Sequence, residues 1–236
     1  MRFDDYGYGA VAAVYEELAS LYSRGRIAAS KRSQLKHLNP GDRVLYAGVG
    51  RGEDALLAAR FGIRVTAVDL SGGMLRRLAR RLDREGLEAQ LIQGDVASMA
   101  SRGAETTRAS EASEASRALE ERYDAVVANY FLNLFEVERA GAMLERLAER
   151  VRPGGLILCA DFALPVGGRF GRWISEAYYR PVNWIAWAVG LCDLHPILDY
   201  PRLLEPLGFR IRSEERFPVG PGRNPAYLSL AAEREA

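Results

Sequence analysis

The chain has 236 residues, with 32 Lys and Arg against 31 Asp and Glu, so its formal charge at neutral pH is +1. Hydrophobic residues make up 48% and charged residues 27% of the sequence, as in a soluble globular protein, and the length suits one domain over residues 1–236. Proteins that bind nucleic acids in general are strongly basic, and this chain is not, so no nucleic-acid partner is expected.

Metal-binding residues are scarce. The sequence holds only two cysteines and two histidines, which are Cys159, Cys192, His37 and His195. Neither cysteine belongs to a C-x-x-C pair, which excludes a structural zinc site, and a histidine-rich metal centre is not expected either. We therefore predict no metal-binding residues, although composition alone leaves a site made of carboxylates open.

The sequence also indicates where the protein resides. Residues 1–10 contain two aspartates and lack the apolar core of a signal peptide. The longest aromatic-rich apolar run, Trp184 to Cys192, is shorter than the roughly 20 residues that cross a bilayer. A cytoplasmic location is expected.

Strand and helix patterns alternate along the chain. Apolar spacing from Val11 to Leu38 predicts two helices separated near Gly25, within an N-terminal helical cap over residues 1–40. Further helices are predicted at Glu53 to Phe61, Met74 to Leu82 and Ala140 to Arg150, the last one ended by Pro153-Gly154-Gly155. The predicted strands are Arg43 to Ala47, Arg64 to Val68, Ala89 to Gln93, Tyr123 to Ala128, Leu156 to Asp161, Phe209 to Phe217 and Ala226 to Ala231. This order predicts an α/β fold: a doubly wound, Rossmann-like, seven-stranded and mostly parallel sheet with an antiparallel C-terminal hairpin.

Two segments depart from this alternation. Residues Ser98 to Arg122 are rich in Ser, Ala, Glu and Arg, and without an apolar face they predict a low-complexity surface insertion. Residues Leu164 to Tyr200 are rich in aromatic rings and are expected to form a second cap over the sheet. These rings either line a pocket for a planar acceptor or pack on the sheet, and with neighbouring arginines they also suit a membrane interface.

A glycine-rich loop follows the first predicted strand. Gly48, Gly50 and Gly52 alternate there, which indicates close approach of the backbone to a ligand or a tight turn. The third glycine comes two positions after the second, whereas a dinucleotide-binding fingerprint requires three, so NAD and FAD are disfavoured. Asp69 ends the second strand, where a carboxylate can accept both hydroxyls of a ribose. Its other role would be to cap the next helix, but Ser71 can do that and leave Asp69 free for a ligand.

The third strand ends in Gly94-Asp95-Val96, where a carboxylate beside small residues suits an adenine amino group. The carboxyl ends of parallel strands meet at one edge of a sheet, so these groups predict a single ligand crevice.

Four segments match the motifs of a known family in order and spacing. They are the glycine loop, Val68 to Ser71 with Met74-Leu75, Gly94-Asp95, and Val151 to Gly155. The chain resembles the class I S-adenosylmethionine-dependent methyltransferases over nearly its full length. Within that family it is most similar to the ubiquinone and menaquinone biosynthesis methyltransferases, on account of Asp161 to Pro165 and His195-Pro196.

The resemblance implies S-adenosyl-L-methionine as cofactor, a small-molecule acceptor and a set of binding residues. The loop would wrap the methionine part, Asp69 would hold the ribose, Asp95 and Val96 would bracket adenine, and Asn129 would lie near the sulfonium. The full cofactor-binding set is then Gly48, Gly50, Arg51, Gly52, Asp69, Leu70, Met74, Gly94, Asp95, Val96 and Asn129.

One position departs from the family pattern. Tyr46 stands where the family usually has Asp or Glu, a residue that normally helps to orient the amino group of the cofactor. Either Glu53 or an ordered water takes that role, or the affinity for the cofactor is altered. This departure motivates the alternatives of a cofactor-binding sensor and of a non-methylating enzyme on the same fold.

Methyl transfer asks little acid or base chemistry of a protein, because the sulfonium is already activated and alignment supplies most of the acceleration. Candidate catalytic residues are His195, Tyr130 and Asn133, with Asp161 as a further general base. His195 could deprotonate a phenol or enol near neutral pH, or it could only stabilise a turn before Pro196.

The acceptor is predicted to be small and aromatic, quinone-like or lipid-like. Phospholipid or natural-product N- or O-methylation is the alternative, and peripheral membrane contact is a further hypothesis. The sequence leaves the oligomeric state open.

Overall fold

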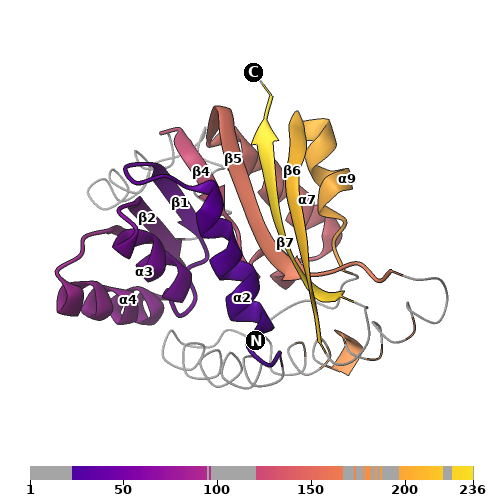
Figure 1. The fold of residues 1–236 in the computed structure, drawn as a ribbon, viewed down its shortest axis with the longest axis horizontal. Coiled ribbons are helices and arrows are strands. Elements are labelled where there is room, and N and C mark those ends of the chain that lie inside the picture. Colours follow the sequence, from indigo (N-terminus) through magenta and orange to yellow (C-terminus); the bar gives the residue numbers. More distant parts are fainter. Residues whose placement is uncertain are drawn as a thin grey trace, which may run out of the picture.

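Seven strands form the central sheet of the computed structural model, which describes residues 23–94, 96, 121–166, 173, 177, 179–181, 184, 187, 197–219 and 225–235. The strands are β1 (Arg43–Ala47), β2 (Arg64–Asp69), β3 (Gln90–Gln93), β4 (Tyr123–Val127), β5 (Val151–Phe162), β6 (Phe209–Pro218) and β7 (Pro225–Arg234). Their order is β3-β2-β1-β4-β5-β7-β6 (Figure 1). The pairs from β3 to β5 are parallel, and β7 is antiparallel to both β5 and β6. The predicted parallel sheet with an antiparallel C-terminal hairpin is confirmed.

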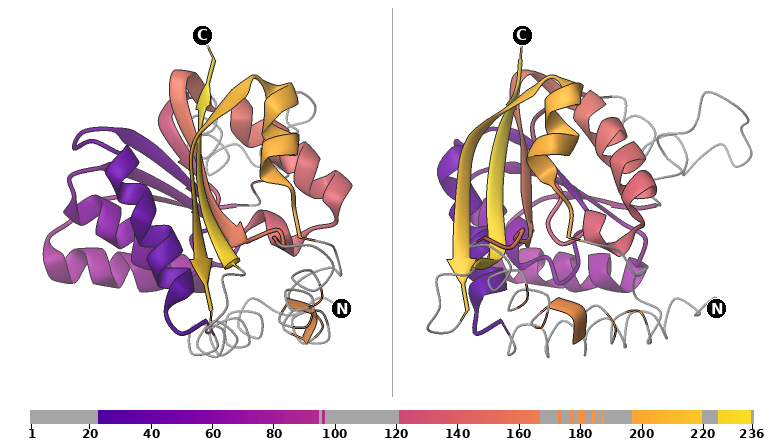
Figure 2. Two further views of the ribbon diagram at one scale, coloured as in Figure 1. Left: turned by 45° about the vertical axis from the view of Figure 1, so that its right-hand side comes forward. Right: turned by 90° about the vertical axis from the view of Figure 1, so that its right-hand side faces the viewer.

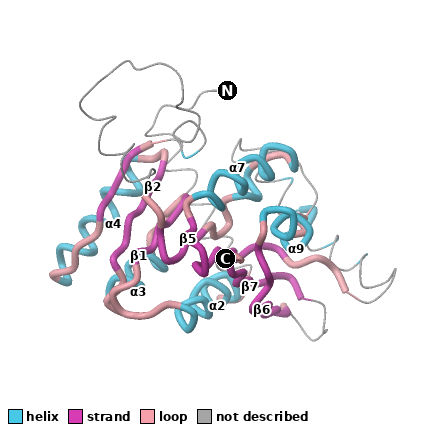
Figure 3. Tube along the Cα trace, turned by 90° about the horizontal axis from the view of Figure 1, so that it is seen from above, coloured by secondary structure: helices cyan, strands magenta, loops and turns pink. Residues whose placement is uncertain are grey.

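Helices cover both faces of this sheet. They are α2 (Arg26–Arg32), α3 (Glu53–Arg60), α4 (Gly72–Glu85), α7 (Val137–Glu149) and α9 (Tyr200–Leu204), with short 3₁₀ helices η1 (Ser33–His37), η2 (Leu132–Leu134) and η3 (Glu205–Leu207). Seen from above in Figure 3, α2 and α3 lie on one side of the strands and α7 and α9 on the other. In both views of Figure 2, α9 lies beside α7, against which it packs.

The side chains of β1 show how the two faces are filled. Val44 and Tyr46 belong to the hydrophobic core under α3 and α4, whereas Leu45 and Ala47 belong to the core under α7. Successive side chains of a strand point to opposite faces, so an uninterrupted apolar strand fits a sheet that is covered on both sides.

Most predicted boundaries agree with the structure to within a few residues, and the region around residue 150 is the exception. There α7 ends at Glu149, and Pro153 to Gly155, predicted to end the helix, lie inside β5. The pairing of β4 with β5 shifts register at this point, and a Cβ on Gly155 would lie 2.8 Å from the carbonyl oxygen of Asp124. Gly155 therefore permits a bulge in β5 at which two backbone segments approach closely, and it does not end the helix.

The outer strand β6 is rich in charge. Its exposed side chains are Arg210, Arg212, Glu214 and Arg216, and such side chains discourage edge-to-edge pairing with another sheet. Next to it, β7 lies between β5 and β6. At the end of β7 the Arg234 guanidinium donates hydrogen bonds to the carbonyls of Ala148 (2.9 Å) and Val151 (2.7 Å).

The order of the strands reverses between β1 and β4, which makes that gap the switch point of the sheet. Three segments follow the carboxyl ends of neighbouring strands here: the glycine loop after β1, the loop after Asp69 of β2, and the segment from Asn129 after β4. In open α/β sheets ligands bind at this place.

Several predictions fall on residues outside the described set. They concern residues 1–22 of the N-terminal cap, most of the Ser98 to Arg122 insertion, much of the Leu164 to Tyr200 cap, and the site residues Asp95 and His195. Within the described residues, no helix is both long and apolar enough to cross a membrane.

Candidate functional site

The glycine loop owes its conformation to both backbone and packing. Gly48, Gly50 and Gly52 have φ angles of 74°, 49° and 68°, in the left-handed region that favours glycine. A Cβ on Gly48 would lie 2.5 Å from the ring of Phe131, and one on Gly52 would lie 2.9 Å from Leu78. A side chain at either position would therefore strain the backbone and clash with a neighbour.

Asp69 holds this loop in place. Its Oδ2 accepts hydrogen bonds from the backbone N–H of Val49 (2.8 Å) and Gly50 (3.1 Å), and its Oδ1 accepts one from Ser71 (2.8 Å). Ser71 caps α4 by accepting from the N–H of Met74. Ser71 thus caps α4 as predicted, whereas Asp69, expected to be free for a ligand, already accepts three backbone hydrogen bonds. Burial raises the pKa of Asp69, and the three N–H groups oppose that shift.

The other sequence-predicted cofactor residues divide between surface and core. Leu70 is 63% exposed beside Asp69, whereas Met74 and Val96 are buried in the hydrophobic cores. The N–H of Gly94 donates to the carbonyl of Asp69, which brings the ends of β2 and β3 together. Arg51 lies in the loop with its guanidinium 3.6 Å from Glu53.

Asn129, predicted to lie near the sulfonium, is the centre of a buried polar network. Its Oδ1 accepts from Gln34 Nε2 (2.8 Å) and from the N–H of Ala160 (2.8 Å). Its Nδ2 donates to Gln34 Oε1 (2.9 Å) and Asp54 Oδ2 (2.9 Å). These bonds join η1, α3 and β5 to the end of β4, so Asn129 fixes the shape of the switch point.

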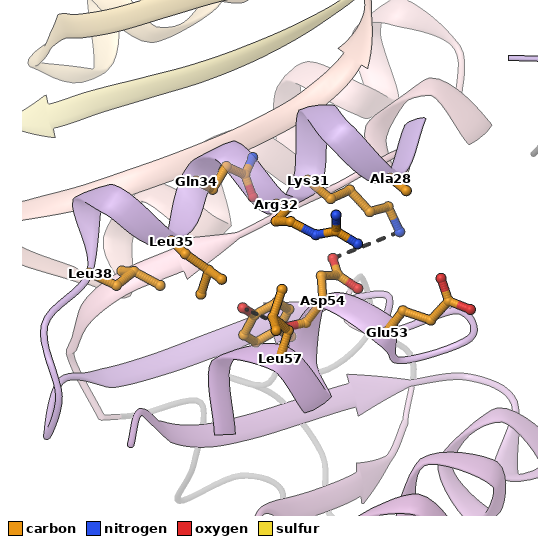
Figure 4. Close-up of a pocket in the computed structure, with 10 residues that line it drawn as sticks. Ala28, Lys31, Arg32, Gln34, Leu35, Leu38, Glu53, Asp54 and Leu57 are labelled. Carbon is orange, nitrogen blue, oxygen red and sulfur yellow. Dashed lines mark hydrogen bonds and ion pairs between the residues drawn. The ribbon is translucent and has the colours of Figure 1, made fainter. Parts of the chain in front are cut away.

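A small cavity lies between α2, η1 and α3 (Figure 4). It encloses about 50 Å³ and is lined by Ala28, Lys31, Arg32, Gln34, Leu35, Leu38, Tyr46, Glu53, Asp54 and Leu57. Tyr46 is one of these lining residues, and its hydroxyl lies 3.5 Å from the carbonyl oxygen of Asp54. Burial and nearby Asp54 raise the pKa of Tyr46, so the phenol stays neutral and does not supply the negative charge that an acidic residue would.

Tyr130 follows Asn129 in a strained conformation. Its φ of 51° is left-handed, which is costly for a residue with a large side chain. Its hydroxyl shares a 2.9 Å hydrogen bond with Ser30 of α2, and its ring makes edge contacts with Phe162 and Tyr227. Tyr179 contacts Phe162 in turn, at 4.7 Å between ring centroids. Four rings therefore gather around the C-terminal end of β5 and the start of β7.

Of the remaining catalytic candidates, Asn133 lies in η2 a few residues after Tyr130, and His195 is outside the described residues. Asp161 is buried and accepts hydrogen bonds from the Tyr200 hydroxyl and from the N–H of Phe162. The structure thus gives Asp161 a structural partner in α9.

Sequence reasoning missed Ser30, Lys31, Gln34 and Asp54, which all contact residues at the switch point. Glu53 and Asp54 were visible as an acidic pair opening a helix, but the pattern alone does not tell which of the two is buried. In the structure the side chain of Glu53 is 54% exposed and that of Asp54 only 9%.

A second, wider hollow of about 670 Å³ lies at the opposite end of the strands, lined by residues that include Arg43 and Arg64. It is remote from the glycine loop and from Asp69, so the smaller cavity at the carboxyl edge is the better candidate. No cluster of three or more His, Cys, Asp or Glu side chains that could hold a metal occurs among the described residues.

Comparison with known proteins identifies relatives of this chain. A family model described as a methyltransferase domain matches residues 44–155. The demethylmenaquinone methyltransferase of Corynebacterium glutamicum (strain R) is 29% identical over 189 residues, which cover 79% of this chain and 69% of that protein.

Two solved structures share the fold. One is the magnesium protoporphyrin IX methyltransferase of Synechocystis PCC 6803 with bound S-adenosylhomocysteine, with a TM-score of 0.62 and 19% identity over 91% of this chain and 84% of that one. The other is the 1,6-didemethyltoxoflavin-N1-methyltransferase of Burkholderia thailandensis, with a TM-score of 0.59 and 21% identity over 100% and 92% of the two chains.

Proposed function

We propose that this chain, which belongs to the class I S-adenosylmethionine-dependent methyltransferases, methylates a small aromatic or quinone-like acceptor. The observation that carries the choice of acceptor is the cluster of four rings, Tyr130, Phe162, Tyr179 and Tyr227, of which Tyr130 and Phe162 are partly exposed. Aromatic side chains bind flat apolar molecules through offset and edge contacts. The similarity to demethylmenaquinone methyltransferases supports the same class of acceptor.

The residues at the carboxyl edge fit S-adenosylmethionine, the cofactor of the family. The tight glycine loop lets a ligand approach the backbone between β1 and α3, and the Asp69 carboxylate lies beside the loop with acceptor capacity left on Oδ1. We propose that Asp69 holds the ribose and that Asp95 and Val96 bracket adenine. Leu70, exposed after β2, would cover one face of the nucleoside.

The cofactor supplies a methyl group already activated on its sulfonium, so the protein has to bind and align the two reactants. Tyr130 is fixed for that purpose from two sides, by Ser30 and by the rings of Phe162 and Tyr227. We propose that Tyr130 and Asn133 position the acceptor and that His195 accepts its proton. The acceptor atom, whether carbon, oxygen or nitrogen, is left to the experiment.

Product analysis tests this function. The purified protein is incubated with S-adenosylmethionine and a panel of naphthoquinols, catechols and aminophospholipids, and products are identified by mass. Methylation of a quinol or phenol with equimolar S-adenosylhomocysteine is the expected result. Methylation of the aminophospholipid alone, or cofactor binding without turnover on any acceptor, would contradict it.

Exposed tryptophans favour peripheral contact with a membrane as a route to a lipid-like acceptor. Trp173, Trp184 and Trp187 are 66%, 59% and 47% exposed and occupy helical positions, as does exposed Arg180. We call these four exposed side chains, Trp173, Arg180, Trp184 and Trp187, the tryptophan face. Tryptophan and arginine together favour the headgroup region of a bilayer. We propose that this tryptophan face rests on anionic lipid.

A further inference from the structure

One carboxylate oxygen at the switch point lacks a partner. Asp54 Oδ1 is buried and has no hydrogen-bond partner in the part of the chain that the structure describes. The other oxygen, Oδ2, accepts from Asn129 Nδ2 and lies 3.7 Å from Lys31 Nζ. A buried charged group with an unused acceptor is unfavourable unless a ligand or a solvent molecule completes its hydrogen bonds.

The cavity beside Asp54 limits what that ligand can be. Its volume of about 50 Å³ admits a group of a few heavy atoms and excludes a nucleoside. Lys31 and Arg32 of α2 face Asp54 across it (Figure 4). The lining has two acids, exposed Glu53 and buried Asp54, and two cations. A buried acid opposite two cations matches a zwitterion, with an ammonium toward Asp54 and a carboxylate toward the cations.

A purely structural role explains only part of this arrangement. An acid in the first turn of α3 interacts favourably with the helix dipole, and the Lys31 pair adds to that. Neither interaction uses Oδ1. The neighbouring Glu53 also lies in the first turn, but its side chain is 54% exposed and pairs with Arg51, so water can solvate it.

The location links this cavity to the reacting groups. Asp54 accepts a hydrogen bond from Asn129 at the end of β4, and Lys31 Nζ lies 5.7 Å from the ring centroid of Tyr130. Tyr46, in β1 below, offers no charge. Of the groups that line the cavity, only Asp54 is a buried carboxylate.

We propose, on the basis of the function assigned above, that Asp54 and Lys31 bind the α-amino-acid end of the cofactor. Asp54 Oδ1 accepts hydrogen bonds from its ammonium, and Lys31 pairs with its carboxylate. The negative charge that recognises the amino group is thus carried by α3 and not by β1, and Glu53 takes no part.

Titration calorimetry with two ligands tests this assignment. S-Adenosylhomocysteine carries the amino-acid end, whereas 5′-methylthioadenosine keeps the adenosine and the sulfur and lacks that end. Asp54→Asn is expected to weaken binding of S-adenosylhomocysteine at least tenfold and to change the dissociation constant of 5′-methylthioadenosine less than twofold. Asp83→Asn, which removes the charge of an exposed acid of α4 outside the cavity, is the control and is expected to change neither value.

Lys31→Met provides a second variant that leaves the carboxylate in place. It is expected to weaken S-adenosylhomocysteine at least threefold, again without effect on 5′-methylthioadenosine. Equal weakening of both ligands in either folded variant, or no weakening of S-adenosylhomocysteine, would overturn the assignment. If the unsubstituted protein binds neither ligand, the proposed function itself falls, and the assignment with it.

Discussion

The side-chain amides of Gln34 and Asn129 exchange two hydrogen bonds, with N–O distances of 2.8 and 2.9 Å. This buried pair connects η1, at the described N-terminal side of the fold, with the end of β4. Each amide gives the other one donor and one acceptor, so every polar atom of the two groups has at least one hydrogen-bond partner. The pair therefore anchors α2 and η1 over the switch point.

Asn129→Asp is expected to destabilise the protein by about 2–4 kcal/mol. The substitution keeps the shape but replaces the Nδ2 donor with an oxygen that faces Asp54 Oδ2 and Gln34 Oε1, two acceptors. Urea unfolding at neutral pH measures the change. A loss of less than about 1 kcal/mol would show that the network does not anchor this edge.

Asp69→Ala is expected to weaken S-adenosylhomocysteine binding more than tenfold, or by about 1.4 kcal/mol. The side chain holds the N–H groups of Val49 and Gly50 and is proposed to hold the ribose, so its loss removes both functions. Calorimetry on the folded variant provides the value. Asp83→Asn, a change at an exposed acid of α4, is the control, and an unaltered dissociation constant for Asp69→Ala would refute the ribose assignment.

Gly48→Ala is expected to cost about 2–4 kcal/mol of stability, because it combines a positive φ with a Cβ placed 2.5 Å from Phe131. Adding Phe131→Ala should relieve the clash but not the backbone strain, and the unfolding free energies of the single and double variants separate the two. Gly141→Ala in α7 is the matched control. Its Cβ meets nothing within 4 Å, so it should stabilise the helix by about 0.5–1 kcal/mol.

Asp124→Asn is expected to lower stability by about 1 kcal/mol at neutral pH. Burial alone would raise the pKa of Asp124, but the N–H of Arg43 and the side chain of Arg152 lower it below its usual 3.8. A carboxyl group whose pKa is lower in the folded than in the unfolded protein stabilises the fold at pH values above its unfolded-state pKa. This stabilisation is lost as the pH falls through its folded-state pKa. The difference between the two proteins should therefore be constant near pH 7 and shrink below about pH 4. A difference independent of pH would contradict the cause assigned here.

Vesicle co-sedimentation tests the tryptophan face. We expect the protein to associate with phosphatidylglycerol-containing vesicles and less with pure phosphatidylcholine, because Arg180 favours anionic headgroups. Replacing Trp184 and Trp187 by Ser should reduce the bound fraction at least fivefold. If the unsubstituted protein stays in the supernatant with both vesicle types, the membrane proposal is wrong.

Local pattern was sufficient to predict much of this fold. The run from Arg43 to Ala47 is uniformly apolar after its first residue, and it predicted β1 to the residue. The acid at the end of β2 and the Ser that caps α4 were also identified, since strand ends and helix caps are encoded within a few residues.

Tertiary contacts account for what the sequence did not predict. The bulge at Gly155 depends on the carbonyl of Asp124 in a neighbouring strand. Similarly, Gln34 and Asp54 reach Asn129 from positions 95 and 75 residues away. No periodicity within a segment reports such pairings. The turn signal at Pro153 to Gly155 corresponds to residues without a register partner in β4, but it did not indicate that they lie within a strand.

From the position of β7 we expect β6 and β7 to join the sheet last. Because β7 lies between β5 and β6, β6 leaves the ribosome before the strand that connects it to the sheet. Until β7 has been synthesised, the charged side chains of β6 keep that strand solvated. The two strands are close in sequence, so their hairpin forms through local contacts and docks on β5 as a unit. Arg234 then secures the docked pair to the end of α7, which makes this side of the sheet the last to assemble.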